Sequence, residues 1–278
     1  MAPVKPAPFD YVRAGTEDEI LAALQAHGAE ARILAGGQTL IPMLSMRLAR
    51  PAVLIDLMRV PSLREIAVER DAVRIAAAVR QAAVLARPTL AEDVPLLAAA
   101  LPWVGHFQTR ARGTVCGSAA HADPSAEIPL CLVALGGEIH LAGPRRRRRV
   151  AAEAFFAGMM VTDKADDEFI AALSFPRRRP GVGYAFAEVG RRRGDFALVA
   201  CAAVVDAARM RLAVAGVADR PTARDFPVLD GAALDDALNG FAWDLGAGDD
   251  VHATARYRRD LVRKLGRAVL EEAATCRS

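Results

Sequence analysis

The sequence has few cysteines, and none of them stands near another. The four cysteines of this 278-residue chain are Cys116, Cys131, Cys201 and Cys276, and no Cys-x-x-Cys spacing occurs. The wide spacing argues against a zinc or iron–sulfur site made by this chain alone. Four separate thiols are typical of a reducing compartment, so we expect a cytoplasmic protein.

Long hydrophobic runs are also missing, although 53% of the residues are apolar. The longest apolar segments, residues 95–105 and 197–205, are much shorter than the roughly 18 residues that a membrane span requires. Residues 1–6, Met-Ala-Pro-Val-Lys-Pro, contain no apolar core of a signal peptide. We therefore expect neither a membrane span nor export.

Aromatic residues and net charge are both low. Aromatic side chains make up 5% of the sequence, and 36 basic residues against 33 acidic ones leave a net charge of +3. Nucleic-acid binding normally requires a strongly basic surface or aromatic side chains that stack on bases, and the sequence provides neither. Three arginine runs, at 145–149, 177–179 and 191–193, are local exceptions. We interpret them as solvated segments, with docking on a protein partner as the alternative.

What the sequence does contain is a short apolar run that ends in two adjacent glycines. Residues 31–40 read Ala-Arg-Ile-Leu-Ala-Gly-Gly-Gln-Thr-Leu, which predicts a buried strand followed by a tight turn. Gly36 and Gly37 can adopt positive φ and leave room for a ligand beside the backbone. Their N–H groups can converge on an anion. A connecting turn without any ligand is the alternative.

A second stretch with glycines, residues 112–129, contains several polar residues close together. It reads Arg-Gly-Thr-Val-Cys-Gly-Ser-Ala-Ala-His-Ala-Asp-Pro-Ser-Ala-Glu-Ile-Pro. Asp123 followed by Pro124 predicts a helix start with Asp123 as the N-cap. His121 and Glu127 would then lie near that start, where N–H groups favour an anion. A metal site made by these acids and the histidine is a weaker alternative, because the ligand mix suits no particular metal.

The pattern of apolar residues divides the chain into three expected units, residues 1–58, 59–176 and 177–278. In the first unit, a helix begins at a capping box formed by residues 16–19 and ends at Gly28. This helix alternates with short apolar strands, which predicts a partly parallel sheet.

The second and third units are expected to contain different sheets. In the second unit the expected strands are 63–68, 73–79, 138–142 and 168–175, and a basic turn covers 144–150. The third unit has three strand-like stretches that favour an antiparallel sheet. It ends in a long amphipathic helix that we expect to begin after Asp249 or Asp250.

Two glycine turns lie about eighty positions apart, each expected after an apolar strand, and together they indicate a protein family more specifically than either turn alone. With this pair the sequence resembles the flavin-binding medium subunit of molybdenum hydroxylases, the carbon monoxide dehydrogenase and xanthine dehydrogenase family. Residues 35–42 match the family's first flavin motif, and residues 114–118 with 120–124 match its second. Residues 194–199, 216–221 and 257–261 resemble its C-terminal signatures, so the resemblance covers nearly the whole chain.

The resemblance implies an α+β fold and FAD as the cofactor. The fold would be a two-lobed FAD-binding domain of the PCMH (vanillyl-alcohol oxidase-like) type, with lobes 1–58 and 59–176. A C-terminal α+β domain, 177–278, would carry an antiparallel sheet and a long terminal helix. The implied cofactor-binding residues are Ala35, Gly36, Gly37, Gln38, Thr39, Leu40, Thr114, Cys116, Gly117, Ser118, His121, Asp123, Glu127 and Ile170.

The resemblance also implies roles for these residues. The first turn would wrap the FAD pyrophosphate through backbone N–H groups, and the second would hold it from the other lobe. Glu127 would bond flavin hydroxyls, with His121 and Asp123 beside it, and Ile170 would pack near the flavin. No residue of the chain is implied as catalytic and none as a metal ligand.

The implied function is that of an oxidoreductase subunit in a complex of three different subunits. A large partner would hold a molybdenum cofactor and oxidise the substrate. A small partner with two [2Fe–2S] clusters would pass electrons to FAD, which would deliver them to an external acceptor. A stand-alone FAD-dependent reductase or oxidase on the same fold is one alternative, and a scaffold that has lost its flavin is another.

The sequence departs from the family pattern at two positions. Cys116 replaces the first glycine of the second motif, so either its φ is compatible with a side chain or the turn is altered. We expect a packing residue rather than a redox thiol, because burial in apolar surroundings raises the pKa of a thiol. Glu188 stands where many relatives carry a basic residue near the flavin, which changes the expected electrostatics around the ring.

Overall fold

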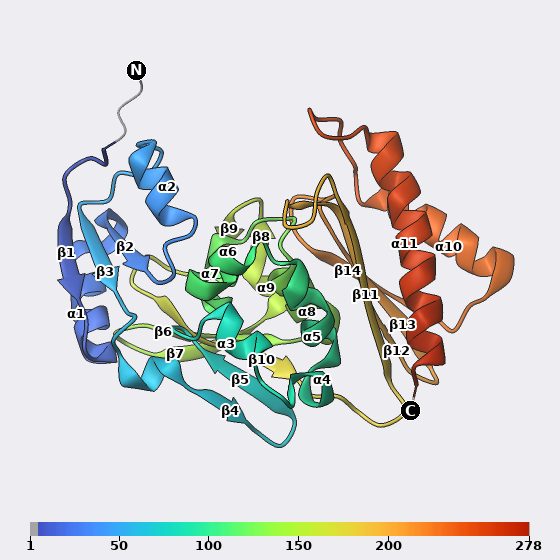
Figure 1. The fold of residues 1–278 in the computed structure, drawn as a ribbon, viewed down its shortest axis with the longest axis horizontal. Coiled ribbons are helices and arrows are strands. Elements are labelled where there is room, and N and C mark those ends of the chain that lie inside the picture. The colour runs from blue at the N-terminus through green and yellow to red at the C-terminus, as the bar shows by residue number, and fades with distance from the viewer. Residues whose placement is uncertain (1–4, 278) are drawn as a thin grey trace.

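Three larger sheets lie in a row along the longest axis of the molecule (Figure 1). The structure is a computed structural model that describes residues 5–277. Residues 1–4, part of the segment expected to lack a signal peptide, lie outside the described residues. Among residues 5–277, no helix combines the length and apolar character that crossing a bilayer requires.

The N-terminal sheet is parallel and has the strand order β1-β3-β2. Its strands are β1 (Asp10–Arg13), β2 (Ala31–Leu34) and β3 (Val53–Asp56), with helices α1 (Glu17–His27) and α2 (Leu40–Ser45). Thr16 accepts a hydrogen bond from the Glu19 N–H at 3.2 Å, and Gly28 ends α1. The predicted helix and partly parallel sheet are therefore confirmed. The short strand β1 was not expected, because its residues are mostly exposed and show no apolar alternation.

The middle sheet has five strands in the order β4-β5-β10-β6-β7, and all its pairs are antiparallel. The strands are β4 (Ile66–Val68), β5 (Ala72–Ala76), β6 (Glu138–Ala142), β7 (Arg147–Ala151) and β10 (Phe169–Pro176). Two expectations were wrong in detail. The strand expected at 63–68 begins only at Ile66, because residues 63 and 64 belong to a 3₁₀ turn, Pro61–Arg64. The basic segment from Arg147 onward is a strand instead of a turn.

Short helices cover the middle sheet. They are α3 (Gln81–Leu85), α4 (Leu90–Asp93), α5 (Pro95–Ala100), α6 (Phe107–Arg112), α7 (Val115–His121), α8 (Glu127–Leu135) and α9 (Ala152–Phe155). The second glycine turn follows helix α6, and not the apolar strand that we expected. Its only strand-like feature within residues 5–277 is an isolated bridge between Arg80 and Thr114.

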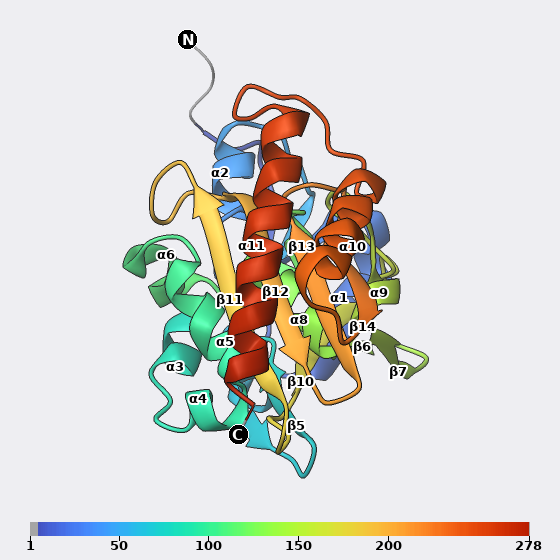
Figure 2. The same cartoon turned by 90° about the vertical axis from the view of Figure 1, so that its right-hand side faces the viewer.

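The C-terminal sheet is antiparallel, as predicted, in the order β11-β12-β13-β14. Its strands are β11 (Gly183–Gly190), β12 (Ala197–Val205), β13 (Arg209–Ala215) and β14 (Thr222–Pro227), followed by α10 (Gly231–Asp244) and α11 (Ala255–Thr275). Helices α10 and α11 cover the outer face of the sheet (Figure 2). Strand β14 and helix α10 were not expected from the sequence.

The long terminal helix begins later than predicted. Thr254 is its N-cap and accepts a hydrogen bond from the Tyr257 N–H at 3.2 Å, so neither Asp249 nor Asp250 caps it. Val251, which the pattern placed on the helix, is 92% exposed. Asp250 instead accepts the N–H groups of His252 and Ala253 in the preceding loop, and Asp249 accepts the N–H of Ala255, the first residue of α11.

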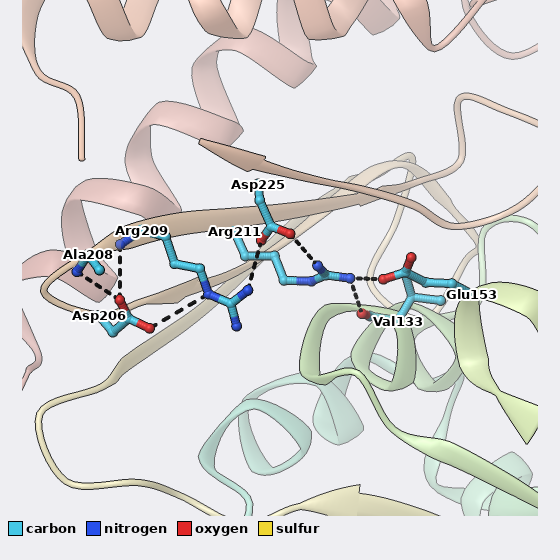
Figure 3. Close-up of polar contacts among 7 residues, drawn as sticks. All are labelled: Val133, Glu153, Asp206, Ala208, Arg209, Arg211 and Asp225. Atoms are coloured by element: carbon cyan, nitrogen blue, oxygen red, sulfur yellow. Dashed lines mark hydrogen bonds and ion pairs between the residues drawn. The ribbon is translucent and has the colours of Figure 1, made fainter. Parts of the chain in front are cut away.

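Helix α8 connects the middle and C-terminal units. Eight of its nine residues are buried, and it packs against β12 and β13 on one side and α5 and α7 on the other. At its C-terminal end, Arg211 of β13 donates to the Val133 carbonyl at 3.2 Å and forms ion pairs with Glu153 and Asp225 (Figure 3). The C-terminal sheet is thus joined to the middle unit by both apolar packing and a charged cross-link.

Candidate functional site

The first glycine turn leaves its backbone donors free. It connects β2 to α2, and Gly37 has φ +70°, a conformation that favours glycine. None of the N–H groups of residues 36–40 has a hydrogen-bond acceptor within residues 5–277. The Gln38 side-chain amide donates to the Gly36 carbonyl at 3.2 Å and steadies the turn. Such a run of free N–H groups suits an anionic ligand.

Gly36 brings the two glycine stretches into direct contact. A Cβ at this position would lie 2.4 Å from the Arg112 carbonyl oxygen and 2.7 Å from Gly113 Cα. The missing side chain of Gly36 therefore makes room for the backbone of the second stretch. The two motifs that the sequence singled out separately meet at this point.

The second glycine stretch forms the first turn of α7. Thr114 is the N-cap, and its hydroxyl accepts the Gly117 N–H at 3.0 Å. A Cβ on Gly117 would approach that hydroxyl to 2.8 Å, so glycine is needed for the capping geometry. The Val115 N–H donates to the Val79 carbonyl at 3.2 Å. Ser118 is half-buried in the same turn.

Cys116 is compatible with this turn because its backbone is helical, with no positive φ. The side chain is 3% exposed, and its thiol donates to the Ile75 carbonyl at 3.5 Å. Burial raises the pKa of the thiol, which keeps it protonated. The structure thus places Cys116 in the apolar core as a packing residue.

The segment from His121 to Glu127 differs from the expected helix start. Asp123 accepts the Ser125 N–H at 2.8 Å in a local turn, and α8 begins only at Glu127, after Ala126. The prediction that Asp123 caps a helix starting at Pro124 was therefore wrong. His121 ends α7 and is half-buried. Within the described part of the chain, no group of three His, Cys, Asp or Glu side chains could hold a metal ion.

Glu127 is a buried carboxyl group beside this segment. It is 6% exposed, and desolvation raises its pKa to about 7, an effect that the charge of Asp123 increases and that of Arg110 opposes. Arg110 comes from α6, where its guanidinium donates to the carbonyls of Val104 and Gly105, both at 2.9 Å. Ile170 lies in β10 at a register shift and is 5% exposed. It belongs to the sheet against which α7 packs.

Two further buried polar groups, Glu188 and Gln81, were not among the expected cofactor-binding residues. Glu188 on β11 is 8% exposed, and its Oε2 has no hydrogen-bond partner within residues 5–277. Gln81 donates to the Thr114 carbonyl at 3.4 Å, while its Oε1 lacks a partner in the same described range. The resemblance had marked Glu188 as a departure from the family pattern, whereas nothing in the sequence marked Gln81.

The donor and acceptor groups of this region fit a dinucleotide. Free N–H groups in the first turn suit phosphate oxygens. Buried carboxyl groups that have no side-chain partner within residues 5–277 suit hydroxyl or N–H donors of a ligand. The residues that supply them come from α2, α7, α8 and the segments that precede these helices, and, for Glu188, from β11.

Comparisons with known proteins point to the same cofactor. The family model described as FAD binding domain in molybdopterin dehydrogenase matches residues 7–178. The chain is 38% identical to the nicotine 6-hydroxylase medium subunit of Paenarthrobacter nicotinovorans, over 88% of this chain and 90% of that protein. It is 33% identical to the carbon monoxide dehydrogenase medium chain of Afipia carboxidovorans, over 96% of this chain and 97% of that protein.

Solved structures agree with the sequence relatives. A chain of carbon monoxide dehydrogenase from Hydrogenophaga pseudoflava superposes with a TM-score of 0.92 at 29% identity, covering 98% of this chain and 99% of that one. A chain of quinoline 2-oxidoreductase from Pseudomonas putida 86 gives a TM-score of 0.90 at 31% identity, covering 98% of both chains. The predicted fold class, the FAD cofactor and the oxidoreductase assignment are confirmed. The chain therefore belongs to the family of FAD-binding medium subunits of the molybdopterin dehydrogenases, or molybdenum hydroxylases.

Proposed function

We propose that this chain is the electron-transfer subunit that carries FAD in a three-subunit molybdenum hydroxylase. It would receive electrons from [2Fe–2S] clusters of a small partner subunit and deliver them through FAD to an external acceptor. A large partner subunit with the molybdenum cofactor would oxidise the substrate. Relatives named as medium subunits of nicotine and carbon monoxide enzymes support this assignment, as does a similar structure named Cu,Mo-CO dehydrogenase.

The observation that carries the proposal for the site is the contact between the two glycine stretches at Gly36. The free N–H groups of residues 36–40 lie in the turn that makes this contact. We assign the pyrophosphate of FAD to residues 35–40, with Thr114, Cys116, Gly117 and Ser118 supporting it from the second stretch. Cys116 would contribute its backbone N–H, which has no acceptor within residues 5–277, because its thiol is buried.

The remaining site residues would hold the flavin-bearing half of the cofactor. Glu127 would accept hydrogen bonds from hydroxyl groups of FAD, since among residues 5–277 its buried carboxyl has no donor other than its own N–H. Asp123 and His121 would shape the loop beside it, and Ile170 would supply apolar packing. When bound, FAD supplies the one- and two-electron chemistry, while the chain binds and orients it.

We place the domain boundaries where the sheets change. Residues 1–58 and 59–176 would be the two lobes of the FAD-binding domain, and 177–278 the C-terminal domain, because each unit contains one of the three larger sheets. We also place the complex in the cytoplasm. The four free cysteines of this chain, three of them buried, support this placement, because free thiols are typical of a reducing environment.

The visible absorption spectrum of the purified full chain, with any subunits that copurify, tests the function. Bound flavin gives absorption bands at about 370 and 450 nm. Saturating FAD at about 100 times its Kd raises the free energy of unfolding by about 2.7 kcal/mol, because only the folded chain binds it. A protein that neither carries FAD nor is stabilised by it would contradict the proposal and favour a scaffold without flavin. Turnover of a small substrate by the isolated chain would favour a stand-alone oxidase or reductase.

Substituting a bulky residue in the first turn tests the site. We expect Thr39→Trp to lower FAD affinity at least tenfold, about 1.4 kcal/mol, while the melting temperature of the FAD-free protein changes little. Leu48→Trp is the matched control, because Leu48 follows the same helix and is exposed. Equal loss of FAD affinity in both variants, or none in either, would contradict the assignment of the pyrophosphate site.

A further inference from the structure

The run of five arginines at 145–149 forms an edge of the middle sheet and takes no part in the proposed FAD site. The run begins in the turn after β6 and continues into β7. Strand β7 stands last in the order β4-β5-β10-β6-β7, so among residues 5–277 it pairs only with β6. Both strands lie at the right-hand margin of the molecule in Figure 2. The longest run of one charge in the chain therefore follows an unpaired strand edge.

The backbone of β7 has free hydrogen-bonding groups on its outer side. The Gly143 N–H donates to the Arg146 carbonyl at 3.0 Å, which begins the ladder between β6 and β7. Opposite residues of an antiparallel pair alternate between bonded and non-bonded, so Arg148 bonds to β6. Arg147 and Arg149 direct their N–H and carbonyl groups outward, where no group of residues 5–277 bonds to them.

The side chains of β7 divide between the two faces of the sheet. Arg148 is half-buried, and its guanidinium binds both carboxylate oxygens of Glu168, at 2.8 and 2.7 Å. Arg147 and Arg149 lie on the opposite face, because successive residues of a strand alternate, and both are exposed. Arg148 thus stabilises the fold, whereas its two neighbours in the strand face solvent.

Two acids on this face compensate only part of its charge. Glu17 of α1 accepts from the Arg147 guanidinium at 2.6 Å. The Arg149 guanidinium lies 3.7 Å from the Glu138 carboxylate, which is longer than a hydrogen bond. The two arginines of the turn, 145–146, form no ion pair with any other residue of the described range 5–277. The edge therefore has guanidinium groups available for further carboxylates.

A cavity of about 280 Å³ lies beside the exposed arginines. The residues that line it include Glu17, Arg74, His140, Arg147 and Arg149. Burial and the charge of Arg149 lower the pKa of His140, so the imidazole is neutral at pH 7. The arginines therefore determine the charge of this cavity, and it has room for an acidic side chain on the same face as Arg147 and Arg149.

We propose that the outer edge of β7 binds an extended acidic segment of a partner protein, which pairs antiparallel with β7 and places carboxylates on Arg147 and Arg149. In such strand addition, main-chain hydrogen bonds give affinity and alternate side chains give specificity. Alternate residues of a strand lie about 7 Å apart on one face, so acids at every second position meet both arginines. The inference goes beyond the proposed function, because it needs no bound FAD.

The composition of the edge disfavours two other occupants. A second copy that paired antiparallel about Arg149 would place this arginine opposite itself, and like charges directly opposite each other destabilise a strand pair. Residues 138–151 contain no Phe, Tyr or Trp, so the bases of a nucleic acid would find no aromatic ring on which to stack. An acidic peptide segment suits both the free backbone groups and the arginines.

Fluorescence anisotropy of labelled peptides with the full chain tests the proposal. The probe is a seven-residue peptide in which glutamate alternates with valine, and the control peptide has lysine in place of glutamate. We expect the glutamate peptide to bind about tenfold or more tightly than the lysine peptide at about 50 mM salt. Its affinity should fall at about 500 mM salt, because exposed charges are screened. Equal affinities of the two peptides would contradict the role of the arginines.

Two methylated peptides distinguish strand addition from attraction between charges alone. In the proposed antiparallel pairing, a glutamate opposite Arg147 or Arg149 directs its N–H at β7, and the valine N–H groups point away. Methylation of the glutamate nitrogens should therefore weaken binding about tenfold or more, and methylation of the valine nitrogens about twofold or less. Equal affinity of the two methylated peptides would overturn the proposal. This comparison uses the unmodified chain and does not depend on the folding of any variant.

The double variant Arg147→Gln/Arg149→Gln tests the two arginines. We expect it to bind the glutamate peptide about three- to tenfold more weakly, because each exposed ion pair contributes little. Arg256→Gln/Lys264→Gln is the matched control, since it removes the same charge from exposed positions of α11. Equal weakening by the two double variants would contradict a site at β7. Melting temperatures establish that both variants are folded.

Other results would assign the edge to another occupant. A dimer in analytical ultracentrifugation that the glutamate peptide dissociates would mean that a second copy covers β7. A single-stranded oligonucleotide that binds as tightly as the glutamate peptide, and that Arg147→Gln/Arg149→Gln weakens equally, would indicate a general polyanion surface. Either result would overturn the proposal, as would failure of the glutamate peptide to bind. The proposed FAD-binding function would stand in each case.

Discussion

The two glycine turns differ in how their backbone N–H groups are used. In the first turn, the N–H groups of residues 36–40 have no acceptor within residues 5–277. In the second turn, the Val115 N–H binds the Val79 carbonyl and the Gly117 N–H binds the Thr114 hydroxyl. The first turn is thus available to a ligand, whereas the second is held largely by protein groups. Their contact at Gly36 shows that the second also positions the first.

The largest effect on this arrangement is expected from Gly36→Ala. The new Cβ would meet the Arg112 carbonyl oxygen at 2.4 Å, and backbone on both sides must move. We expect the free energy of unfolding to fall by about 1–3 kcal/mol, as for other overpacked sites. FAD affinity should fall as well, because the two turns separate. Denaturant unfolding and FAD titration measure the two effects.

Gly240→Ala is a suitable control for that substitution. Gly240 lies in α10, and a Cβ there would meet no atom within 4 Å. The exchange should leave FAD affinity unchanged and raise stability by up to about 1 kcal/mol, because alanine favours helix more than glycine. Equal behaviour of the two variants would show that the contact between the turns does not matter.

A smaller effect is expected from Gly37→Ala, which tests the conformation of the first turn alone. At φ +70° an alanine costs about 1–2 kcal/mol, and the nearest obstacle is only the flexible Ile41 side chain. Gly37→Asn should recover part of this loss, because asparagine tolerates this conformation better. Thermal unfolding of the FAD-free chain measures the difference. If asparagine recovered no stability, the requirement for glycine at position 37 would come from lack of space for a side chain and not from the positive φ.

Thr114→Ala tests the second turn, where we expect a loss of about 1 kcal/mol, typical of a removed N-cap. Thr114→Ser retains the hydroxyl that accepts the Gly117 N–H and should remain near the stability of the unmodified chain. If the second turn mainly positions the first, FAD affinity should decline in Thr114→Ala less than in Gly36→Ala. The opposite order would mean that the second turn binds FAD more directly than its hydrogen bonds indicate.

The smallest perturbation is modification of the cysteines, which probes how tightly the second turn is packed. Cys276 is exposed, whereas Cys116, Cys131 and Cys201 are buried, and burial raises the pKa of each of these three thiols. A thiol reagent should therefore label about one cysteine per folded chain and all four after denaturation. Rapid labelling of Cys116 in the folded chain would contradict a closed second turn.

Local signals in the sequence were enough to predict several elements. The helix Glu17–His27 has its capping residues and its terminating glycine within a few positions, and strand β6 was predicted with its observed limits. Helix α10 was missed although Leu234, Leu238 and Phe241 recur at helical spacing, because Gly240 and nearby turn residues weaken the pattern. Strand β14 was missed because prolines stand at Pro221 and Pro227.

The site was harder to predict, because its geometry depends on contacts between distant residues. The sequence identified both glycine stretches, but not that Gly36 faces the Arg112 backbone. It also placed a helix start at Asp123, where the carboxylate instead binds the nearby Ser125 N–H and the helix is delayed. Which groups surround Glu188 depends on how the sheets pack, which the sequence pattern of one strand does not give.

Helix α8 has a consequence for dividing or recombining this protein. The family match ends at residue 178, yet the helix inside that range is covered by β12 and β13 from beyond it. A fragment cut at this boundary would expose an almost wholly apolar helix surface to water and leave the Val133 carbonyl without the Arg211 guanidinium. The segment that carries the cofactor motifs therefore depends on the C-terminal sheet to bury one of its own helices.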